Sequence, residues 1–296
     1  MAGLLVLTGG WAQAAKSKKL CTATSVAAFK ACYASTLDDF WIAVGKCDNL
    51  SDVSERKDCL REAKPERKDN AVSCREQFAA RRDVCDALGE DPYDPQIDPA
   101  DFVVGIDNPF LPLVPGTTMV YQKGEERIEV KVTAETKEIL GVTCVEVEDT
   151  VTIDGELVEE TLDWYAQDML GNVWYFGELS RNYEDGELNN LDGSWQAGVD
   201  GAKPGIVMLA DPMVGDVYRQ EFLLGEAEDM ARVVARDEEV TVPHPPGTFT
   251  TLKTEEWNPL EPEMLENKFY APGVGLVLAV DVVTGEREEL IDIIME

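Results

Sequence analysis

Cys47-Asp-Asn-Leu-Ser-Asp-Val-Ser-Glu-Arg-Lys-Asp-Cys59 is the centre of a mirror-symmetric set of six cysteines. Read outward from this stretch, the successive cysteines along the chain are separated by steps of 11, 15, 12, 15 and 11 residues. In an antiparallel helical hairpin, residues equidistant from the turn lie opposite one another, and these steps are close to whole numbers of helical turns. Residues 16–88 therefore predict a helical hairpin with its turn near 49–52. The mirror symmetry predicts three disulfides: Cys47–Cys59, Cys32–Cys74 and Cys21–Cys85.

Two features of this hairpin leave alternatives open. Pro65 is expected to break or kink the second arm, or to begin a separate helix there. The cysteines are disfavoured as zinc ligands, because zinc sites use cysteines a few residues apart and these are at least 11 apart. The disulfides are expected to stabilise a unit too small for a large core, and the alternative is a hairpin that presents a face to a protein partner.

The first 15 residues predict the remnant of a secretory signal peptide. A short apolar run ends in Ala12-Gln13-Ala14, a small-x-small cleavage pattern, although an ordinary N-terminal strand is the alternative. Lys18-Lys19-Leu20 precedes the first cysteine and lacks the small residues of a lipid-attachment site. No later apolar run approaches the length of a membrane-spanning helix. We expect a non-lipidated protein, secreted or periplasmic, in an oxidising compartment.

Charge separates the chain into two parts. The 296 residues contain 58 Asp and Glu against 26 Lys and Arg, a net charge of -32 that repels nucleic acid. Residues 16–88 hold 14 basic and 12 acidic side chains, whereas residues 89–296 hold 12 and 46. The single histidine, His244, excludes a metal site built from several histidines of one chain. Three prolines within 89–99 indicate an extended linker over 89–107, followed by a separate domain over 108–296.

The acidic domain shows the alternation of β-strands. Ile128, Val130 and Val132 alternate with polar residues, and Asp154-Gly155 and Asp185-Gly186 are tight-turn signals between such runs. No sustained helical period follows residue 108. The sequence therefore predicts roughly ten antiparallel strands in a meander or open half-barrel. The fold class is α+β, a disulfide-linked helical hairpin followed by a mainly antiparallel sheet.

Two motifs resemble a known group of proteins. Phe269-Tyr-Ala-Pro-Gly-Val-Gly-Leu-Val277 is similar to the late strand motif of bacterial secreted proteins and lipoproteins built as half-barrel meanders. Leu162-Asp-Trp-Tyr-Ala-Gln-Asp168, followed by Gly171-Asn-Val-Trp-Tyr-Phe-Gly177, resembles a hairpin of the same proteins. The resemblance covers residues 108–293 and implies a cradle for an apolar or amphipathic ligand, since such half-barrels often hold one.

A concave sheet lined by aromatic residues is the first candidate binding site. Large rings at strand and loop positions would supply its apolar surface, and the glycine-rich loop 191–206 could fold over its mouth. The alternative is that these rings belong to the core. The candidate ligand-binding residues are Trp164, Trp174, Tyr175, Trp195 and Trp257.

A calcium site is the second candidate. Asp185, Glu187, Asn189 and Asp192 have a spacing similar to the start of a helix-loop-helix calcium loop. Asn190 stands where such a loop requires Gly, so the alternative is a set of solvated turn carboxylates or an acidic surface adapted to salt. Calcium is the one possible cofactor.

Hydrolysis by paired carboxylates is the third candidate. Glu159, Glu160, Asp163 and Glu178 lie near aromatic residues, but glycosidase chemistry needs two facing acids, one with a raised pKa. The sequence favours a secreted acidic binding protein for a small apolar or amphipathic ligand or a partner surface. A hydrolase and a cell-surface structural or assembly protein are the alternatives.

Overall fold

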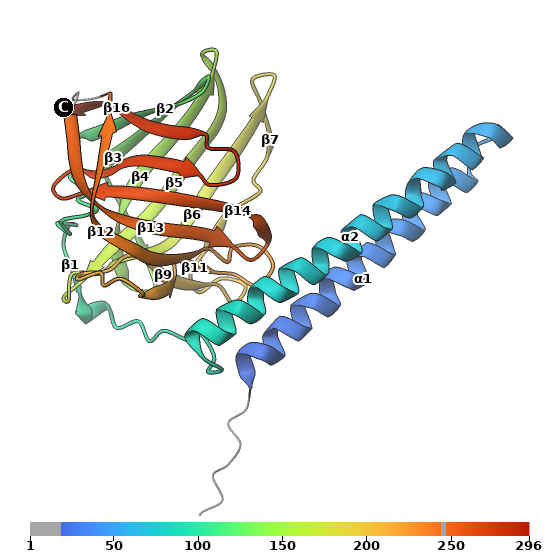
Figure 1. Cartoon of the computed structure of the whole chain (residues 1–296), viewed down its shortest axis with the longest axis horizontal. Helices are drawn as coiled ribbons and strands as arrows, with labels where there is room; N and C mark the ends of the chain where they lie inside the picture. Colours follow the sequence, from blue (N-terminus) through green and yellow to red (C-terminus); the bar gives the residue numbers. More distant parts are fainter. Residues whose placement is uncertain (1–18, 244–246, 296) are drawn as a thin grey trace, which may run out of the picture.

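The helical hairpin is a long arm that projects from a β-barrel (Figure 1). The structure, a computed structural model, describes residues 19–243 and 247–295, so the predicted signal-peptide remnant and His244 lie outside the described residues. Helix α1 (Leu20–Asp48) and helix α2 (Val53–Leu88) run antiparallel and join at residues 49–52. Asp52 begins α2, because its carboxylate accepts the backbone N–H groups of Ser54 and Glu55. The predicted hairpin and its turn are confirmed.

Three disulfides connect the two helices at the base, middle and tip of the arm. They are the pairs that the mirror spacing predicts: Cys21–Cys85, Cys32–Cys74 and Cys47–Cys59. Their Cα–Cα distances of 5.6, 5.8 and 5.5 Å show that the two helices are almost equally close at all three disulfides. Small buried residues beside them, Ala28, Ala63 and Ala71, permit this approach.

The predicted break at Pro65 is wrong. Helix α2 is continuous over its 36 residues, with Pro65 inside it. Proline removes one backbone hydrogen bond and needs room for its ring. The ring is exposed, and the disulfides at Cys59 and Cys74 hold the helix against α1 on either side of it.

Sixteen strands follow the hairpin, more than the ten expected, and all pairs are antiparallel. They are β1 (Phe102–Val103), β2 (Thr117–Lys123), β3 (Glu126–Ile139), β4 (Val142–Ile153), β5 (Glu156–Asp168), β6 (Val173–Glu184), β7 (Glu187–Asn190), β8 (Trp195–Gln196), β9 (Lys203–Met208), β10 (Val217–Arg219), β11 (Glu221–Phe222), β12 (Met230–Val242), β13 (Gly247–Asn258), β14 (Glu261–Ala271), β15 (Gly275–Asp281) and β16 (Arg287–Met295). The main path runs β10-β12-β13-β14-β15-β16-β2-β3-β4-β5-β6-β9-β11. The α+β fold class is confirmed, and the sheet is nearly closed.

The closure depends on one short segment that the sequence predicts as a single strand over 217–223. In the structure this segment divides at Gln220: β10 pairs with β12 at one end of the path, and β11 pairs with β9 at the other. The two ends of the sheet are therefore joined by consecutive residues. Gly205 permits the close approach, because a Cβ there would lie 2.3 Å from the backbone carbonyl carbon of Gln220.

The buried residues form layers on the two faces of the sheet. One cluster brings together Val132, Val147, Tyr218 and Tyr270 from strands far apart in the path, so it lies inside the barrel. Trp164, Cys144 and Phe176 lie in another cluster, which Ala197 and Ala202 join, and Cys144 and Trp164 are on the opposite face of β4 and β5 from Val147. Cys144 is a free, buried thiol.

The base of the hairpin is fixed to the barrel by polar contacts. Arg81 of α2 forms a buried ion pair with Glu228, and the Gln77 amide donates to the Leu260 carbonyl oxygen at 2.9 Å. Downstream of α2, Tyr93 packs against Phe222 and donates its hydroxyl proton to the Pro204 carbonyl oxygen. The predicted linker thus runs along the barrel, and its role as a domain boundary stays a prediction. Among the described residues, no helix has the length and apolar character needed to cross a membrane.

Candidate functional site

The structure does not gather the five predicted aromatic residues around one cavity. Trp164, Tyr175 and Trp195 are buried in one cluster, at 4%, 8% and 5% exposure. Trp174 is half-buried and donates its indole N–H to the Asp168 carboxylate at 2.9 Å. Trp257 lies on β13, beside a different small cavity. Trp195 lies on β8, which pairs with β6 opposite Glu178, and its ring meets that of Tyr175 edge to face at 5.3 Å, so these rings pack as core.

The predicted calcium residues are spread over the β6–β7 turn and the segment that follows. Asp185 occupies the turn with φ of 52°, Glu187 and Asn189 lie on β7, and Asp192 follows it. In the described part of the chain, no group of three or more His, Cys, Asp or Glu side chains has an arrangement that could hold a metal ion. Calcium binding at these residues therefore stays a prediction without support from the geometry.

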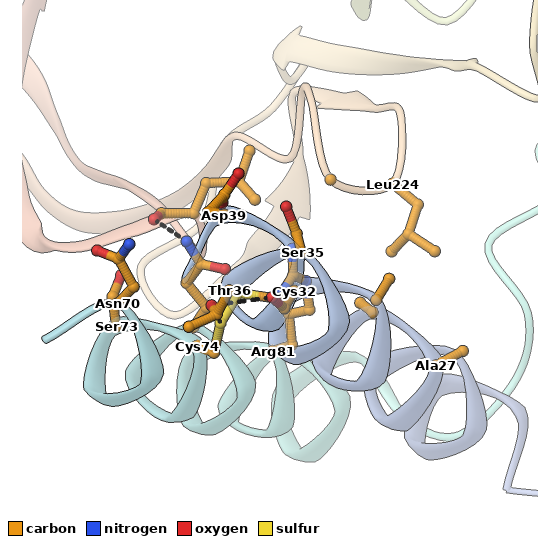
Figure 2. A pocket seen from close by; sticks show the side chains of 15 residues that line it. Ala27, Cys32, Ser35, Thr36, Asp39, Asn70, Ser73, Cys74, Arg81 and Leu224 are labelled. Atoms are coloured by element: carbon orange, nitrogen blue, oxygen red, sulfur yellow. Dashed lines mark hydrogen bonds between the residues drawn. A yellow bond between two sulfur atoms is a disulfide. The ribbon is translucent and has the colours of Figure 1, made fainter. Parts of the chain in front are cut away.

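A cavity lies between the hairpin and the barrel, and we call it the junction cleft (Figure 2). Its volume is about 680 Å³. Helices α1 and α2 provide a floor of small side chains: Ala27, Ala31, Ser35 and Ser73. Leu224 and Leu260, from turns of the barrel, form the facing wall. Asp39 and Asn70 line it with polar groups, so the cleft has an apolar and a polar part.

A buried ion pair sets the geometry of this cleft. The Arg81 guanidinium donates to both carboxylate oxygens of Glu228, at distances of 2.7 to 3.1 Å. The Glu228 carboxylate also accepts the backbone N–H of Gly225 at 2.7 Å. Both side chains are almost completely buried, at 6% and 2% exposure. Such a pair holds the two parts in one orientation, because either charge alone would be buried without compensation. Sequence analysis missed this pair, whose members are 147 residues apart.

Two of the four predicted hydrolase acids face each other inside the barrel. Asp163 on β5 and Glu178 on β6 are register partners, and the Tyr175 hydroxyl contacts both carboxyl groups, at 2.5 and 2.8 Å. A phenol has one proton to donate, so a second proton must reside on one of the two acids if both contacts are hydrogen bonds. Burial raises the pKa of Asp163 well above its usual value and raises the pKa of Glu178 to about 7.

The remaining two acids do not join this pair. Glu160 forms an ion pair with Arg181 at 2.7 Å. Glu159 accepts a hydrogen bond from Thr161 at 3.0 Å. Asp149 on β4 is a further buried acid, and its Oδ1 atom has no hydrogen-bond partner among the described residues. Burial, together with Glu288 and Glu159, raises its pKa to about 7. Burial in the barrel thus raises the pKa of Asp149, Asp163 and Glu178.

Comparisons with known proteins give a limited result. No protein-family model and no curated protein matches the chain. Among solved structures, the chain is similar to one described as a "putative lipoprotein" from Parabacteroides distasonis. The two are 16% identical, with a TM-score of 0.33, and the match covers 62% of this chain and 97% of that one. At that score the likeness carries no conclusion about this chain. The three disulfides, by contrast, are those of an extracellular or periplasmic protein.

Proposed function

We propose that this is an extracellular binding protein that holds an apolar or amphipathic ligand in the junction cleft. The observation that carries the proposal is a cavity of about 680 Å³ at the contact between two structurally different units. Ligand sites in proteins commonly have volumes of roughly 300–1,000 Å³ and lie at such contacts. The proposal moves the ligand from the predicted aromatic concavity to the base of the hairpin.

The lining of the cleft suits a ligand with an apolar side and a polar side. Small side chains such as Ala31 and Ser35 leave the helix surface open, so a ligand can approach the hairpin closely. The wall formed by Leu224 and Leu260 offers apolar contact, and burial of apolar surface stabilises a complex by about 25 cal/mol per Å². Asp39 and Asn70 are available to polar groups of the ligand.

The contacts at the base of the arm make this cleft preorganised. The Arg81–Glu228 ion pair and the hydrogen bond from Gln77 to Leu260 hold both walls before any ligand binds. Cys32 and Cys74, which line the cleft, are joined in a disulfide that fixes the spacing of the two helices there. A rigid site loses less conformational entropy on binding than a mobile one.

Nile red, a neutral apolar dye, tests the proposal. We expect its fluorescence to rise on binding to the oxidised protein, and we expect Ala31→Trp to abolish most of that rise by filling the cleft. Ala79→Trp is the matched control, because Ala79 is exposed on α2 two residues beyond Gln77 and so on the other side of the helix. Equal dye binding by both variants and the natural protein would overturn the proposal.

A hydrolase is the second candidate, and the facing acids Asp163 and Glu178 are the observation that favours it. Asp163 is only 8% exposed, however, and the pair is bridged by Tyr175. We therefore expect no turnover of chromogenic aryl glycosides at any pH between 4 and 8. Turnover that Asp163→Asn removes, in a protein that still binds Nile red, would replace ligand binding by hydrolysis as the function.

A further inference from the structure

Arg219 is a half-buried cation without a carboxylate partner. It lies on β10, and its guanidinium carbon is 4.7 Å from the centre of the Phe222 ring and 5.4 Å from that of Tyr93. These two rings meet edge to face at 5.7 Å, so they form a fixed support for the guanidinium. Guanidinium groups stack on rings in this way while their N–H groups remain free to bind an anion.

No described residue forms an ion pair with Arg219. Within the described ranges, its guanidinium makes one weak hydrogen bond, to the sulfur of Met230 at 3.8 Å. Glu228 acts on Arg219 electrostatically but is occupied by Arg81, to which it is bound through both oxygens. Two guanidinium groups thus face one buried carboxylate, and that carboxylate is bound by Arg81.

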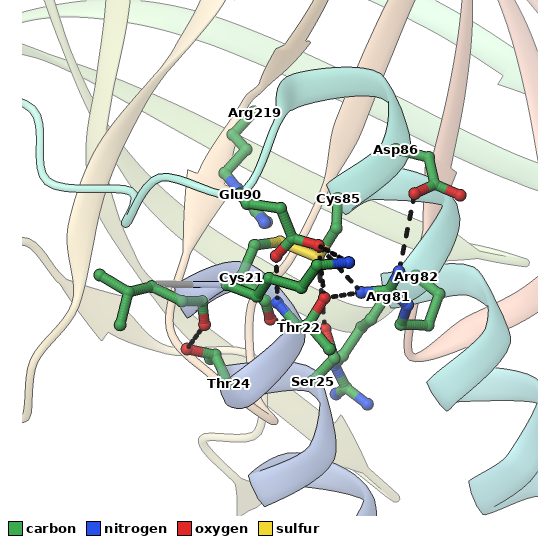
Figure 3. The surroundings of a disulfide bond; sticks show 12 residues. Cys21, Thr22, Thr24, Ser25, Arg81, Arg82, Cys85, Asp86, Glu90 and Arg219 are labelled. Atoms are coloured by element: carbon green, nitrogen blue, oxygen red, sulfur yellow. Dashed lines mark hydrogen bonds and ion pairs between the residues drawn. A yellow bond between two sulfur atoms is a disulfide. The ribbon is translucent and has the colours of Figure 1, made fainter. Parts of the chain in front are cut away.

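Arg219 lines a second cavity of about 270 Å³, which borders the junction cleft at Arg81 and Leu224. Figure 3 shows Arg219 close to the end of α2, where the Cys21–Cys85 disulfide joins the helices. Leu88, Phe222 and Leu224 supply apolar lining, and Thr24 and Ser25 supply hydroxyl groups. Asp91 also lines the cavity, but it is exposed and makes no ion pair with Arg219 among the described residues.

We propose that this cavity binds a small organic carboxylate, whose anionic group is held by Arg219 and whose apolar part contacts Leu88, Phe222 and Leu224. A planar carboxylate matches the parallel N–H groups of a guanidinium, and such charge-assisted hydrogen bonds are stronger than neutral ones. A single negative charge fits Arg219, the guanidinium of this cavity that forms no ion pair among the described residues. An ion of higher charge would meet stronger repulsion from the acidic surface and gains nothing from the apolar lining. The site shares Arg81 and Leu224 with the junction cleft, but Arg219 lines only this cavity, so the carboxylate site does not depend on the ligand proposed for the cleft.

Benzoate and benzamide are the probes that test this site, because they differ in charge and have nearly the same shape. Titration calorimetry of the full-length oxidised protein should show benzoate binding and benzamide binding about tenfold or more weaker. Benzoate affinity should fall when the NaCl concentration is raised from about 0.05 M to about 0.5 M. Equal affinity for the two probes, or no heat with benzoate, would overturn the proposal.

Three variants locate the binding at Arg219. Arg219→Gln should weaken benzoate binding by about tenfold or more, while Arg219→Lys keeps the charge and retains part of the affinity. Asp91→Asn should strengthen binding, since it removes an anion from the lining. The matched control is Arg232→Gln, on the adjacent strand, where the arginine pairs with Glu255.

The same variants separate a binding role from a structural one. An arginine that only stabilises the end of α2 would make Arg219→Gln less stable to heat and leave benzoate affinity unchanged in Arg219→Lys and Asp91→Asn. That pattern would contradict the proposal even if Arg219→Gln fails to fold. An effect of Arg232→Gln as large as that of Arg219→Gln would assign the binding to general surface charge and would also contradict it.

Discussion

The hairpin and the barrel keep their folds by different means. Helices α1 and α2, both fully described, bury small or polar residues such as Ala28, Thr36 and Ala63, and Val84 is the largest apolar side chain among those buried. The barrel buries large side chains completely, among them Phe176, Leu252 and Leu290. Two helices side by side cannot enclose a core, so covalent bonds replace it. A barrel encloses enough apolar surface to tolerate buried carboxyl groups.

Reduction of the disulfides should give the largest difference in stability between the hairpin and the barrel. Each disulfide is expected to stabilise the hairpin by about 2–5 kcal/mol, and little burial remains when all three are broken. We expect dithiothreitol to abolish the helical far-ultraviolet circular dichroism and to leave the near-ultraviolet signal of the buried barrel aromatics. Persistence of the helical signal after full reduction would show that the hairpin has a sufficient core after all.

The next largest effect is expected at the contact between the units. Glu228→Gln leaves the Arg81 guanidinium buried without a counter-charge and should lower the free energy of unfolding by about 3–5 kcal/mol. Urea unfolding measures this loss, and Glu255→Gln, which removes the exposed ion pair with Arg232, should cost under about 1 kcal/mol. The double variant Arg81→Met, Glu228→Gln should recover part of the stability. If Glu255→Gln lowered the free energy of unfolding as much as Glu228→Gln does, the buried ion pair between Arg81 and Glu228 would be contradicted.

The hairpin was predictable because its information is local and periodic. The cysteine spacing determines both the turn and the pairing, and Asp52 marks the start of the second helix. Alternation likewise predicts strands, and hence the sheet. The closure of the barrel was not predictable, because residues 217–223 have the pattern of a single strand. Only the pairing of residues 217–219 with β12 and of residues 221–222 with β9 divides this segment into two strands.

The candidate sites were the least predictable part of the molecule. Residues 89–296 contain 46 Asp and Glu residues, and only the register of the adjacent strands β5 and β6 determines that Asp163 faces Glu178 while Glu160 pairs with Arg181. Arg81 and Glu228 lie on different units, so no local pattern connects them. The size of Trp164 favours a place in a cavity, whereas its burial in a cluster with Cys144 and Phe176 makes it a core residue.

The pH dependence of stability should also distinguish the barrel from the hairpin, with a smaller effect than the two changes above. A buried acid with a raised pKa binds its proton more tightly in the folded state, so stability is highest at low pH and falls as pH rises through the folded pKa. The pKa values of about 7 for Asp149 and Glu178 place this loss between about pH 4 and pH 7.

Asp149→Asn tests this account. It should raise the free energy of unfolding of the barrel at pH 8 by about 1–3 kcal/mol and have little effect at pH 4. Thermal unfolding followed by near-ultraviolet circular dichroism measures both. Asp185→Asn, at an exposed turn, is the control and should change neither value. A stability that rises with pH in the natural protein would show that these acids are ionised in the fold.

The smallest effect is expected at Pro65. Pro65→Ala restores a backbone donor in the middle of α2 and should stabilise the hairpin by about 1–2 kcal/mol. The gain should appear in the helical signal of the partly reduced protein, where the disulfides no longer conceal it. Lys64→Ala, at the preceding exposed position, is the control and should give almost no change.

The position of β16 has a consequence for how the molecule acquires its shape. This strand, residues 287–295, inserts between β15 and β2, so β2 pairs with a segment about 170 residues away. The hairpin needs only residues up to Cys85 and can be oxidised while the rest of the chain is still being delivered. The barrel cannot be completed before β16 is synthesised, and until then β2 and β15 are open edges that could pair with other chains. A chain shortened just before Arg287 should therefore contain a complete arm attached to a sheet that aggregates.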